Sequence, residues 1–314
     1  MWGQFRDQKR DAARDWAGVE LVDENLGMSS GQRTFVVGVD ATEEGGRALA
    51  WTRSAAAADD LIVAVHAWDL PTMVGLDTVA MIPVADMADV AERGLDEVVD
   101  RLDDPRIEPV IHQGHAGRAL VHIADEREAD LIIVGHQGSG RASVVLGSTA
   151  NHVIHHTERP VVVVRGSHAP SPAQIVVGVD DHDLDEHGEN ESVQALRFAA
   201  DMWPAASIDV VHAWFVPSVA AGPFSNPGAD FEDLDAEAVA VAQRVIDAAG
   251  VDADVDLRPR PVNGTPEFAL IEASNDADLV VVGSRGRGGF RGLLLGSTSL
   301  DLASYSHSPV AIVH

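Results

Sequence analysis

Short apolar runs rich in valine and isoleucine alternate along this chain with longer stretches in which apolar residues recur every three or four positions. The first pattern predicts strands buried on both faces, and the second predicts amphipathic helices. Their alternation predicts repeated βα units around a parallel sheet. In the first half the predicted strands lie near residues 34–39, 61–67, 107–112, 130–135 and 160–164, and the predicted helices near 45–58, 86–102, 117–128 and 148–157. In the second half the predicted strands lie near 174–179, 207–213, 253–259, 278–283 and 309–313.

The whole pattern occurs twice. The run RTFVVGVD at 33–40 matches AQIVVGVD at 173–180, and IVAVHAW at 62–68 matches SIDVVHAW at 207–214. Further landmarks recur in the same order: the glycines Gly114 and Gly264, the apolar runs 129–135 and 277–283, and the final runs 158–164 and 307–313. So many landmarks in one order predict two copies of one domain.

The repeat predicts two domains at residues 33–165 and 174–314, joined by a linker at 166–173 that is rich in proline. Residues 1–32 lie outside the repeat, and their loosely helical apolar spacing predicts either a short docking helix or a frayed tail. We expect the two halves to pair through their last strands or through adjacent faces. Whole chains are then expected to form a homodimer.

Each fourth predicted strand leads into a glycine-rich loop, which ends in Gly-Ser-Thr at the start of a predicted helix. In the second half the spacing is Gly283-x-x-Gly286, nine residues, and then Gly296-Ser297. Glycine lets the backbone approach a ligand closely, and the free amides at a helix N-terminus bind anions. This arrangement favours a phosphate site, whereas the simpler alternative is that the glycines only make tight turns between strand and helix.

The arginines of the second loop also favour a polyanionic ligand. Arg285, Arg287 and Arg291 lie together in a half that is otherwise strongly acidic, whereas the first loop has Arg141 alone. On the ligand interpretation, a side chain at Gly283 would occupy the space that a ribose needs. Replacing this glycine by valine is therefore expected to block the site and to leave a cooperative fold.

An aspartate follows the first strand of each half, Asp40 in one and Asp180 in the other. In open parallel sheets, ligands bind beyond the carboxyl ends of the strands, where the winding direction reverses. An aspartate there can bond to a ribose or an adenine edge, or help to place a metal. It can also cap the following helix, and one residue can do both.

These motifs resemble those of the universal stress protein family in its tandem-domain form. The resemblance runs from Arg33 to the end of the chain, and the glycine spacing of the second half is similar to that of the ATP-binding branch. It implies an α/β fold of two tandem Rossmann-like domains, each a five-stranded parallel sheet of order 3-2-1-4-5 with helices on both faces. It also implies that each domain binds ATP, together with Mg²⁺, and it implies no firmly assigned reaction.

The resemblance gives one candidate nucleotide site in each half. In the second half the implied contacts are Gly178, Asp180, Ala213, Val282, Gly283, Gly286, Arg287, Gly296, Ser297 and Thr298. In the first half they are Gly38, Asp40, Ala67, Val134, Gly135, Gly138, Arg141, Gly147, Ser148 and Thr149. The first-strand residues would line the adenosine, the alanines would read the adenine edge, and the others would border the ribose and the phosphates.

Two departures from the family pattern bear on these sites. The first loop has eight residues between Gly138 and Gly147 instead of nine, and one residue spans up to about 3.5 Å of chain. It also begins with His136 where the second loop has Ser284. The acidic insertion at 181–191 either weakens triphosphate binding unless Mg²⁺ intervenes, or is a solvated loop.

Histidines recur at two further places. His152, His155 and His156 have the spacing of one helix face, which is typical of a metal site or of a polar surface. A polar surface is favoured, because no carboxylate lies among them. His66 and His212 occupy equivalent strand ends, where a hydrogen-bonded structural role is expected.

Composition narrows the class of protein. The net charge of −28 predicts a chain that repels nucleic acid and anionic membranes, and the lack of cysteine excludes disulfides and thiolate chemistry. No apolar run approaches the roughly 18–20 residues of a membrane helix. The N-terminal residues lack the apolar stretch of a secretory signal, so a cytoplasmic location is expected. The single lysine, Lys9, does not fit a P-loop.

The function expected from these features is an ATP-binding stress-response protein that senses or buffers nucleotide without firm catalytic activity. Ordering of its loops by ATP would change the surface offered to a regulatory protein partner. The alternative is a slow ATP hydrolase or phosphate-transfer enzyme of the same fold, with Asp180, Asp181 or His136 as candidate general base. A third interpretation is a scaffold whose sites are relics.

Overall fold

The computed structural model describes residues 32–40, 46–69, 84–136, 146–165, 171–182, 184, 187–215, 231–285 and 295–314. The predicted N-terminal extension lies outside the described residues, apart from Gln32. Four implied nucleotide contacts also lie outside them, namely Gly138, Arg141, Gly286 and Arg287.

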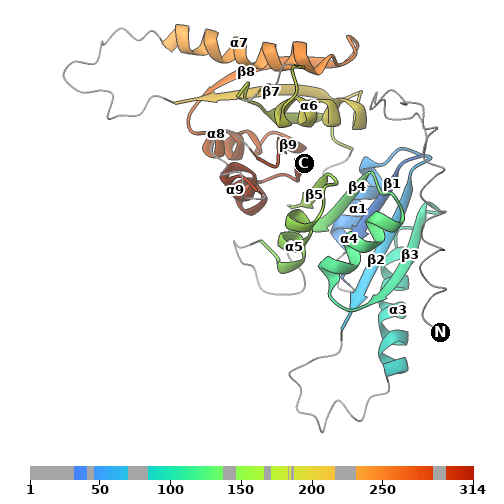
Figure 1. The fold of residues 1–314 in the computed structure, drawn as a ribbon. Helices are drawn as coiled ribbons and strands as arrows, with labels where there is room; N and C mark the ends of the chain where they lie inside the picture. Colours follow the sequence, from blue (N-terminus) through green and yellow to red (C-terminus); the bar gives the residue numbers. More distant parts are fainter. Residues whose placement is uncertain are drawn as a thin grey trace, which may run out of the picture. The chain divides into compact units, whose positions relative to one another are not determined.

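Strands and helices alternate through the N-terminal half, within a few residues of the sequence prediction (Figure 1). They are β1 (Thr34–Gly38), α1 (Gly46–Ala55), β2 (Leu61–Trp68), α3 (Val84–Asp100), β3 (Ile107–Gln113), α4 (Ala116–Glu126), β4 (Leu131–Gly135), α5 (Ser148–His156) and β5 (Val161–Val164). The central strands read as continuous apolar runs because both of their faces are buried.

The C-terminal half repeats this order. Its elements are β6 (Gln174–Gly178), α6 (Glu191–Met202), β7 (Ser207–Trp214), α7 (Phe231–Ala249), β8 (Asp256–Asn263), α8 (Pro266–Ala273), β9 (Leu279–Gly283), α9 (Ser297–Tyr305) and β10 (Val310–Val313). None of the described helices has the length and apolarity needed to span a bilayer.

The strand predicted at 253–259 is displaced in the structure, where β8 begins at Asp256. The amide of Val255 donates to the carbonyl of Asp252 at 3.1 Å, so the predicted start is a turn. The strand then continues through Pro259 and Pro261 to Asn263, beyond the predicted end at residue 259. Both prolines are tolerated because β8 lies at one edge of the sheet, where alternate amides need no partner.

The strands of both halves form one sheet in the order β3-β2-β1-β4-β5-β10-β9-β6-β7-β8. Each half is parallel and has the order 3-2-1-4-5 that the family resemblance implied. β5 and β10 join the halves as an antiparallel pair, with Val162 opposite Ala311. The prediction that the halves pair through their last strands is confirmed.

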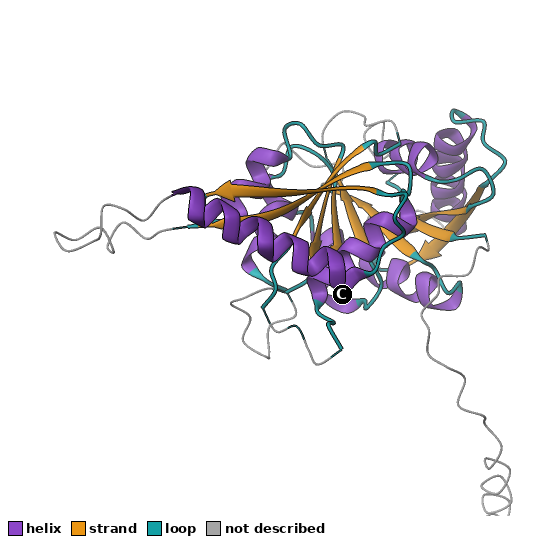
Figure 2. Cartoon of the chain, turned by 90° about the horizontal axis from the view of Figure 1, so that it is seen from above, coloured by secondary structure: helices purple, strands orange, loops and turns teal. Residues whose placement is uncertain are grey.

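Helices cover both faces of the sheet (Figure 2). One core cluster contains buried residues of α1, α3, α6 and α7, and the other contains those of α4, α5, α8 and α9. Each cluster also draws alternate strand residues from both halves, for example Ile133 and Val281 in the first and Val134 and Val282 in the second. This alternation decides which of the two helix layers each strand residue faces.

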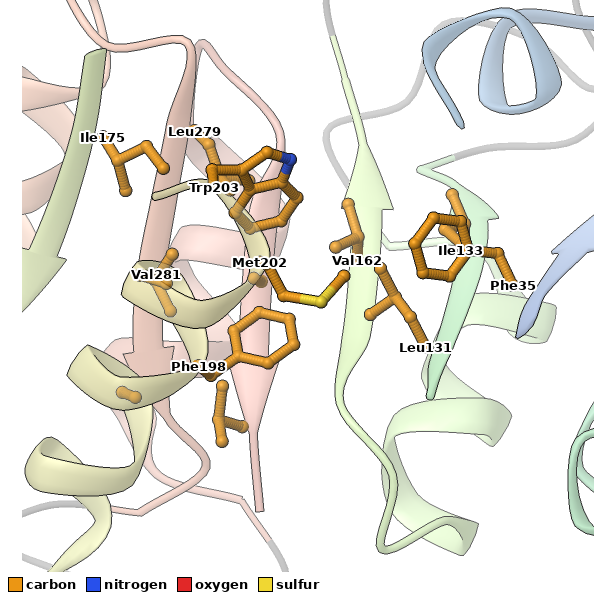
Figure 3. Packing of buried hydrophobic residues seen from close by; sticks show 14 of the residues in the cluster. Phe35, Leu131, Ile133, Val162, Ile175, Phe198, Met202, Trp203, Leu279 and Val281 are labelled. Atoms are coloured by element: carbon orange, nitrogen blue, oxygen red, sulfur yellow. The ribbon is translucent and has the colours of Figure 1, made fainter. Parts of the chain in front are cut away.

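The end of α6 connects the two halves on the first face. Trp203 is 5% exposed and makes an edge-to-face contact with Trp51 of α1, with 6.4 Å between ring centroids. Its Nε1 donates to the carbonyl of Ala55 at 3.2 Å. Figure 3 shows Met202 reaching from α6 toward Val162 of β5. The two halves therefore share the apolar core on this face of the sheet.

The strand pairing limits how copies of this chain can associate. β5 and β10 each have two neighbours, so neither is an edge strand. Within the part of the chain that the structure describes, the edges of the sheet are β3 and β8. A homodimer, which stays a prediction, therefore has to form through surfaces other than the last strands.

Candidate functional site

Each half has a cavity at the carboxyl ends of its strands. The cavity volumes are about 260 Å³ in the N-terminal half and about 380 Å³ in the C-terminal half. Both lie where the first strand meets the fourth, β1 beside β4 and β6 beside β9. The winding direction of each half reverses at this place, which is where ligands bind in open α/β sheets.

The C-terminal cavity is lined by every implied contact of that half that the structure describes. These residues are Gly178, Asp180, Ala213, Val282, Gly283, Gly296, Ser297 and Thr298. They come from the ends of β6, β7 and β9 and from the start of α9. The linear motif therefore assembles around one space.

The N-terminal cavity is less complete. It is lined by the implied contacts Gly38, Asp40, Ala67, Val134, Gly135 and Thr149. Gly147 and Ser148 do not line it, although their counterparts Gly296 and Ser297 line the other cavity. The start of α5 therefore contributes less to its cavity than the start of α9 does.

The two glycine-rich loops close in the same way despite their different lengths. The amide of Gly147 donates to the carbonyl of His136 at 2.9 Å, and the amide of Gly296 donates to the carbonyl of Ser284 at 2.7 Å. Both loops are therefore closed by the same backbone hydrogen bond although they differ by one residue in length. No side chain caps α5 or α9, so their first-turn amides lack the partner that a capping residue would supply.

The strand-end glycines face in different directions. A Cβ at Gly178 would lie 2.6 Å from Cδ1 of Leu270, a residue that lines the cavity. A Cβ at Gly283 would instead lie 2.7 Å from Cβ and 3.2 Å from the carbonyl oxygen of Glu191, at the start of α6. The expectation that a side chain at Gly283 meets ligand was wrong, because this position faces the helix on the other side of the sheet.

Glu191 fastens the beginning of the second loop to α6. Its carboxylate accepts hydrogen bonds from the backbone amide of Arg285 and from Nε of the same residue, the latter at 2.5 Å. The hydroxyl of Ser284 lies 3.4 Å from the same carboxylate. The loop arginine that the structure describes is therefore paired within the protein, although it also lines the cavity.

Asp180 lines its cavity but does not cap α6. Its Oδ1 accepts from the amide of His182 at 3.0 Å, which closes a local turn. The cap is Asn190, whose side chain accepts from the amide of Val193 at 2.9 Å. The capping interpretation of Asp180 was therefore wrong, and the carboxylate remains at the mouth of the cavity.

The acidic insertion is more than a solvated loop where the structure describes it. Asp181 forms an ion pair with Arg244 at 2.7 Å, and Glu189 forms one with Arg197 at 2.7 Å. These pairs tie the insertion to α7 and α6. Its acidic residues are thus partly neutralised by the protein itself.

The recurring histidines have structural partners. Nδ1 of His66 lies 2.8 Å from the carbonyl oxygen of Val39, and Nδ1 of His212 lies 2.8 Å from that of Val179. Both bonds tie the second strand to the end of the first, which confirms the structural role predicted for the pair. Both histidines also line the cavities.

The histidines of α5 bond mainly to their own helix. Nδ1 of His155 lies 2.7 Å from the carbonyl oxygen of Asn151, and Nδ1 of His156 lies 2.8 Å from that of His152. The rings of His152 and His156 are stacked with centroids 4.0 Å apart. Among the described residues, no group of three or more histidines or carboxylates is arranged to hold a metal ion.

Sequence reasoning missed several cavity residues. Arg47, Ala116 and Arg165 line the N-terminal cavity, and Ser192 and Glu267 line the C-terminal one. They lie at helix starts and after the last strand, outside the glycine motifs. The available signal was positional, because parallel strand ends and the helix starts that follow them meet at one edge of the sheet.

The lowered pKa of His136 predicts that the stability of the protein depends on pH. Burial and, to a smaller extent, the nearby charge of Arg165 together lower this pKa from 6.5 to about 4. The unfolded chain therefore takes up a proton between those two values that the folded chain does not. The contribution of His136 to the free energy of unfolding is fully present above pH 6.5, and it falls as the pH drops through this window. After allowing for solvent screening, we expect His136 to account for a loss of about 1 kcal/mol at pH 5.

Urea unfolding at pH 7 and pH 5 measures this loss. The variant His136→Gln is expected to lose less stability between the two pH values than the unchanged chain. His152 and His314 also have lowered pKa values, mainly through burial, and contribute equally to both proteins. An identical pH dependence in both proteins would contradict the assignment.

Comparison with known proteins identifies the family. The model of the universal stress protein family matches residues 32–165 and again 173–314. A universal stress protein of Mycolicibacterium smegmatis is 28% identical over 302 residues, covering 91% of this chain and 98% of that protein. One from Mycobacterium tuberculosis is 30% identical over 234 residues, covering 72% and 74%.

Solved structures that span both halves of the chain agree on the fold. A universal stress protein from Archaeoglobus fulgidus matches with a TM-score of 0.59 at 18% identity, covering 89% of this chain and 97% of that one. A universal stress protein solved in complex with cAMP matches 46% of this chain and 97% of its own, with 28% identity and a TM-score of 0.32.

Proposed function

This chain belongs to the universal stress protein family, and we propose that it binds an adenine nucleotide, ATP with Mg²⁺, in the cavity of each half. One protein of this family has been solved in complex with cAMP. In this proposal the protein acts as a nucleotide-dependent sensor or buffer in the cytoplasm. The observation that carries it is the C-terminal cavity, where the strand ends and the start of α9 meet around about 380 Å³. That volume is within the range of small-molecule sites, about 300–1,000 Å³.

The chemistry of the C-terminal lining suits the parts of a nucleotide. Apolar side chains such as Leu270 and Val282 form one wall for a base. Asp180 can accept hydrogen bonds from ribose hydroxyls. The hydroxyls of Ser297 and Thr298, together with the uncapped amides of α9, supply donors for phosphate oxygens.

The engagement of the candidate bases favours a binding role over hydrolysis. Asp180 accepts a hydrogen bond from its own turn, and Asp181 forms an ion pair with Arg244. A general base must lie within hydrogen-bond reach of the attacking water and be free to accept its proton. Both aspartates thus have partners of their own, and the third candidate, His136, has a pKa lowered to about 4, which makes it a weak proton acceptor.

Two equivalent alanines allow the cavities to be tested separately. Ala67 and Ala213 each lie two positions after a buried valine of the α4 or α8 face, so their side chains share that face. Each alanine lines its cavity. A phenylalanine at either position is expected to fill the space intended for the ligand.

Calorimetric titration with Mg-ATP provides the test. The unchanged chain is expected to bind two equivalents, Ala67→Phe and Ala213→Phe one each, and the double variant none. Each phenylalanine is expected to lower the affinity of its own cavity for Mg-ATP at least 100-fold, because the ligand and the new ring would need the same volume. Ala58→Phe, at an exposed position, is the matched control and should bind as the unchanged chain does. Undiminished binding by the double variant would refute the assignment of the sites.

A further inference from the structure

Arg165 lies directly after β5 and lines the N-terminal cavity. Its guanidinium is partly buried, and this burial lowers its pKa below the usual value, although arginine remains charged in proteins. Its Nη1 donates to the carbonyl of Ala303 in α9 at 2.9 Å. The second half of the chain therefore holds this side chain in the cavity of the first.

Arg165 differs in its charge balance from Arg197 and Arg106, which are also partly buried. Among the described residues, no carboxylate forms an ion pair with it, whereas Arg197 pairs with Glu189 and Arg106 with Asp104. A buried cation is unfavourable unless an opposite charge compensates it. An anionic group in the cavity would supply that compensation.

His136 lies close to this arginine. It also lines the cavity, and its buried Nε2 has no hydrogen-bond partner. Its pKa, lowered to about 4, keeps the ring neutral at physiological pH, so it adds no charge. A neutral imidazole can still donate or accept a hydrogen bond. The unpaired charge at this end of the cavity is therefore that of Arg165.

The C-terminal half lacks this pair. Register places Val164 beside Gly135 and Val313 beside Gly283, so the residues equivalent to Arg165 and His136 are His314 and Ser284. Asp40 and Asp180 line equivalent places in the two cavities, but the C-terminal cavity has Glu267 as a further carboxylate, and its arginine, Arg285, is already neutralised by Glu191. The two cavities thus differ in the charge that they present to a ligand.

We propose that Arg165 and His136 form an anion subsite in the N-terminal cavity, which binds phosphate oxygens of the nucleotide. This inference rests on the proposed function, because it assumes that the cavity receives a nucleotide. Gly147 and Ser148 do not line this cavity, and Arg165 supplies hydrogen-bond donors for the phosphate in their place. Because of this subsite, the affinity of the N-terminal cavity for a ligand depends on the charge of the ligand's phosphates, through a residue outside the glycine motif.

The experiment uses the full chain with Ala213→Phe as the parent, so that only the N-terminal cavity is open. Mg-ATP and adenosine are titrated by calorimetry into the parent and into the parent carrying Arg165→Gln. We expect the affinity for ATP to fall at least tenfold, as for a lost charged hydrogen bond, while the affinity for adenosine stays within about twofold. Arg165→Lys should recover part of the loss, and Arg127→Gln is the control at an exposed arginine paired with Glu108.

Equal ATP affinity with and without Arg165→Gln would overturn the subsite. An equal loss for ATP and adenosine would overturn it as well, since the arginine would then only maintain the shape of the cavity. Failure of the proposed function appears differently, as a parent that binds neither ligand. In that case sodium tripolyphosphate replaces the nucleotides, and binding that disappears in Arg165→Gln supports the subsite while absent binding refutes it.

Discussion

Replacing Gly283 by alanine is expected to lower the free energy of unfolding by about 3 kcal/mol, at the upper end for overpacking a core position. The new Cβ would lie 2.7 Å from Cβ of Glu191 and 3.2 Å from its carbonyl oxygen. Backbone at a helix start cannot move aside as the end of a side chain can. The substitution therefore forces α6 away from β9 and weakens the contact by which Glu191 holds Arg285.

Gly178 provides the matched control, because it also ends a central strand. A Cβ there would meet the terminal methyl groups of Leu270, at 2.6 and 3.1 Å. Leu270 lines the cavity, so its side chain can turn into that space. Gly178→Ala is therefore expected to cost about 1 kcal/mol and to narrow the C-terminal cavity. Urea unfolding measures both variants, and a Gly283→Ala protein as stable as Gly178→Ala would contradict the geometry.

Replacing Trp203 by alanine is expected to cost about 3–5 kcal/mol, the usual range for truncating a buried aromatic residue. The variant loses the contacts with Trp51 and Phe198 and the hydrogen bond to the carbonyl of Ala55. Since Trp51 and Ala55 belong to the other half, the loss also weakens the coupling between the two halves, which the pairing of β5 with β10 then has to maintain. We expect one cooperative unfolding transition to become two.

Denaturant unfolding followed by far-ultraviolet circular dichroism checks this expectation. Phe215→Ala is the aromatic control, since Phe215 is 56% exposed and its truncation should change stability by less than about 0.5 kcal/mol. A Trp203→Ala protein that unfolds in one transition, with a loss close to that of the control, would show that the halves do not depend on this side chain.

The sequence predicts the strands well where apolar residues are continuous. β4 and β5 consist almost wholly of branched apolar residues because both of their faces are buried, and such short continuous runs indicate buried strands. β8 is harder, because its exposed positions and prolines follow from its place at the sheet edge. That place depends on the topology of the whole sheet, which no local pattern contains.

The candidate site shows a similar division. Glycine spacing brings the correct strand and helix ends together, because parallel strands end at one edge of the sheet. The face of the sheet on which Gly283 lies could also have been predicted. Val282 before it faces the cavity, and successive residues of a strand alternate between the two faces. Arg165 could not be predicted as a site residue from the sequence, because its proposed role depends on which groups surround it in three dimensions.

The number of ATP molecules bound by the intact chain tests the central claim most directly. Native mass spectrometry in the presence of Mg-ATP is expected to show complexes with one and then two nucleotides per chain as the concentration rises. The account predicts saturation at two, one for each cavity at the strand ends. A chain that remains free of nucleotide at millimolar ATP, while folded and monodisperse, would contradict it.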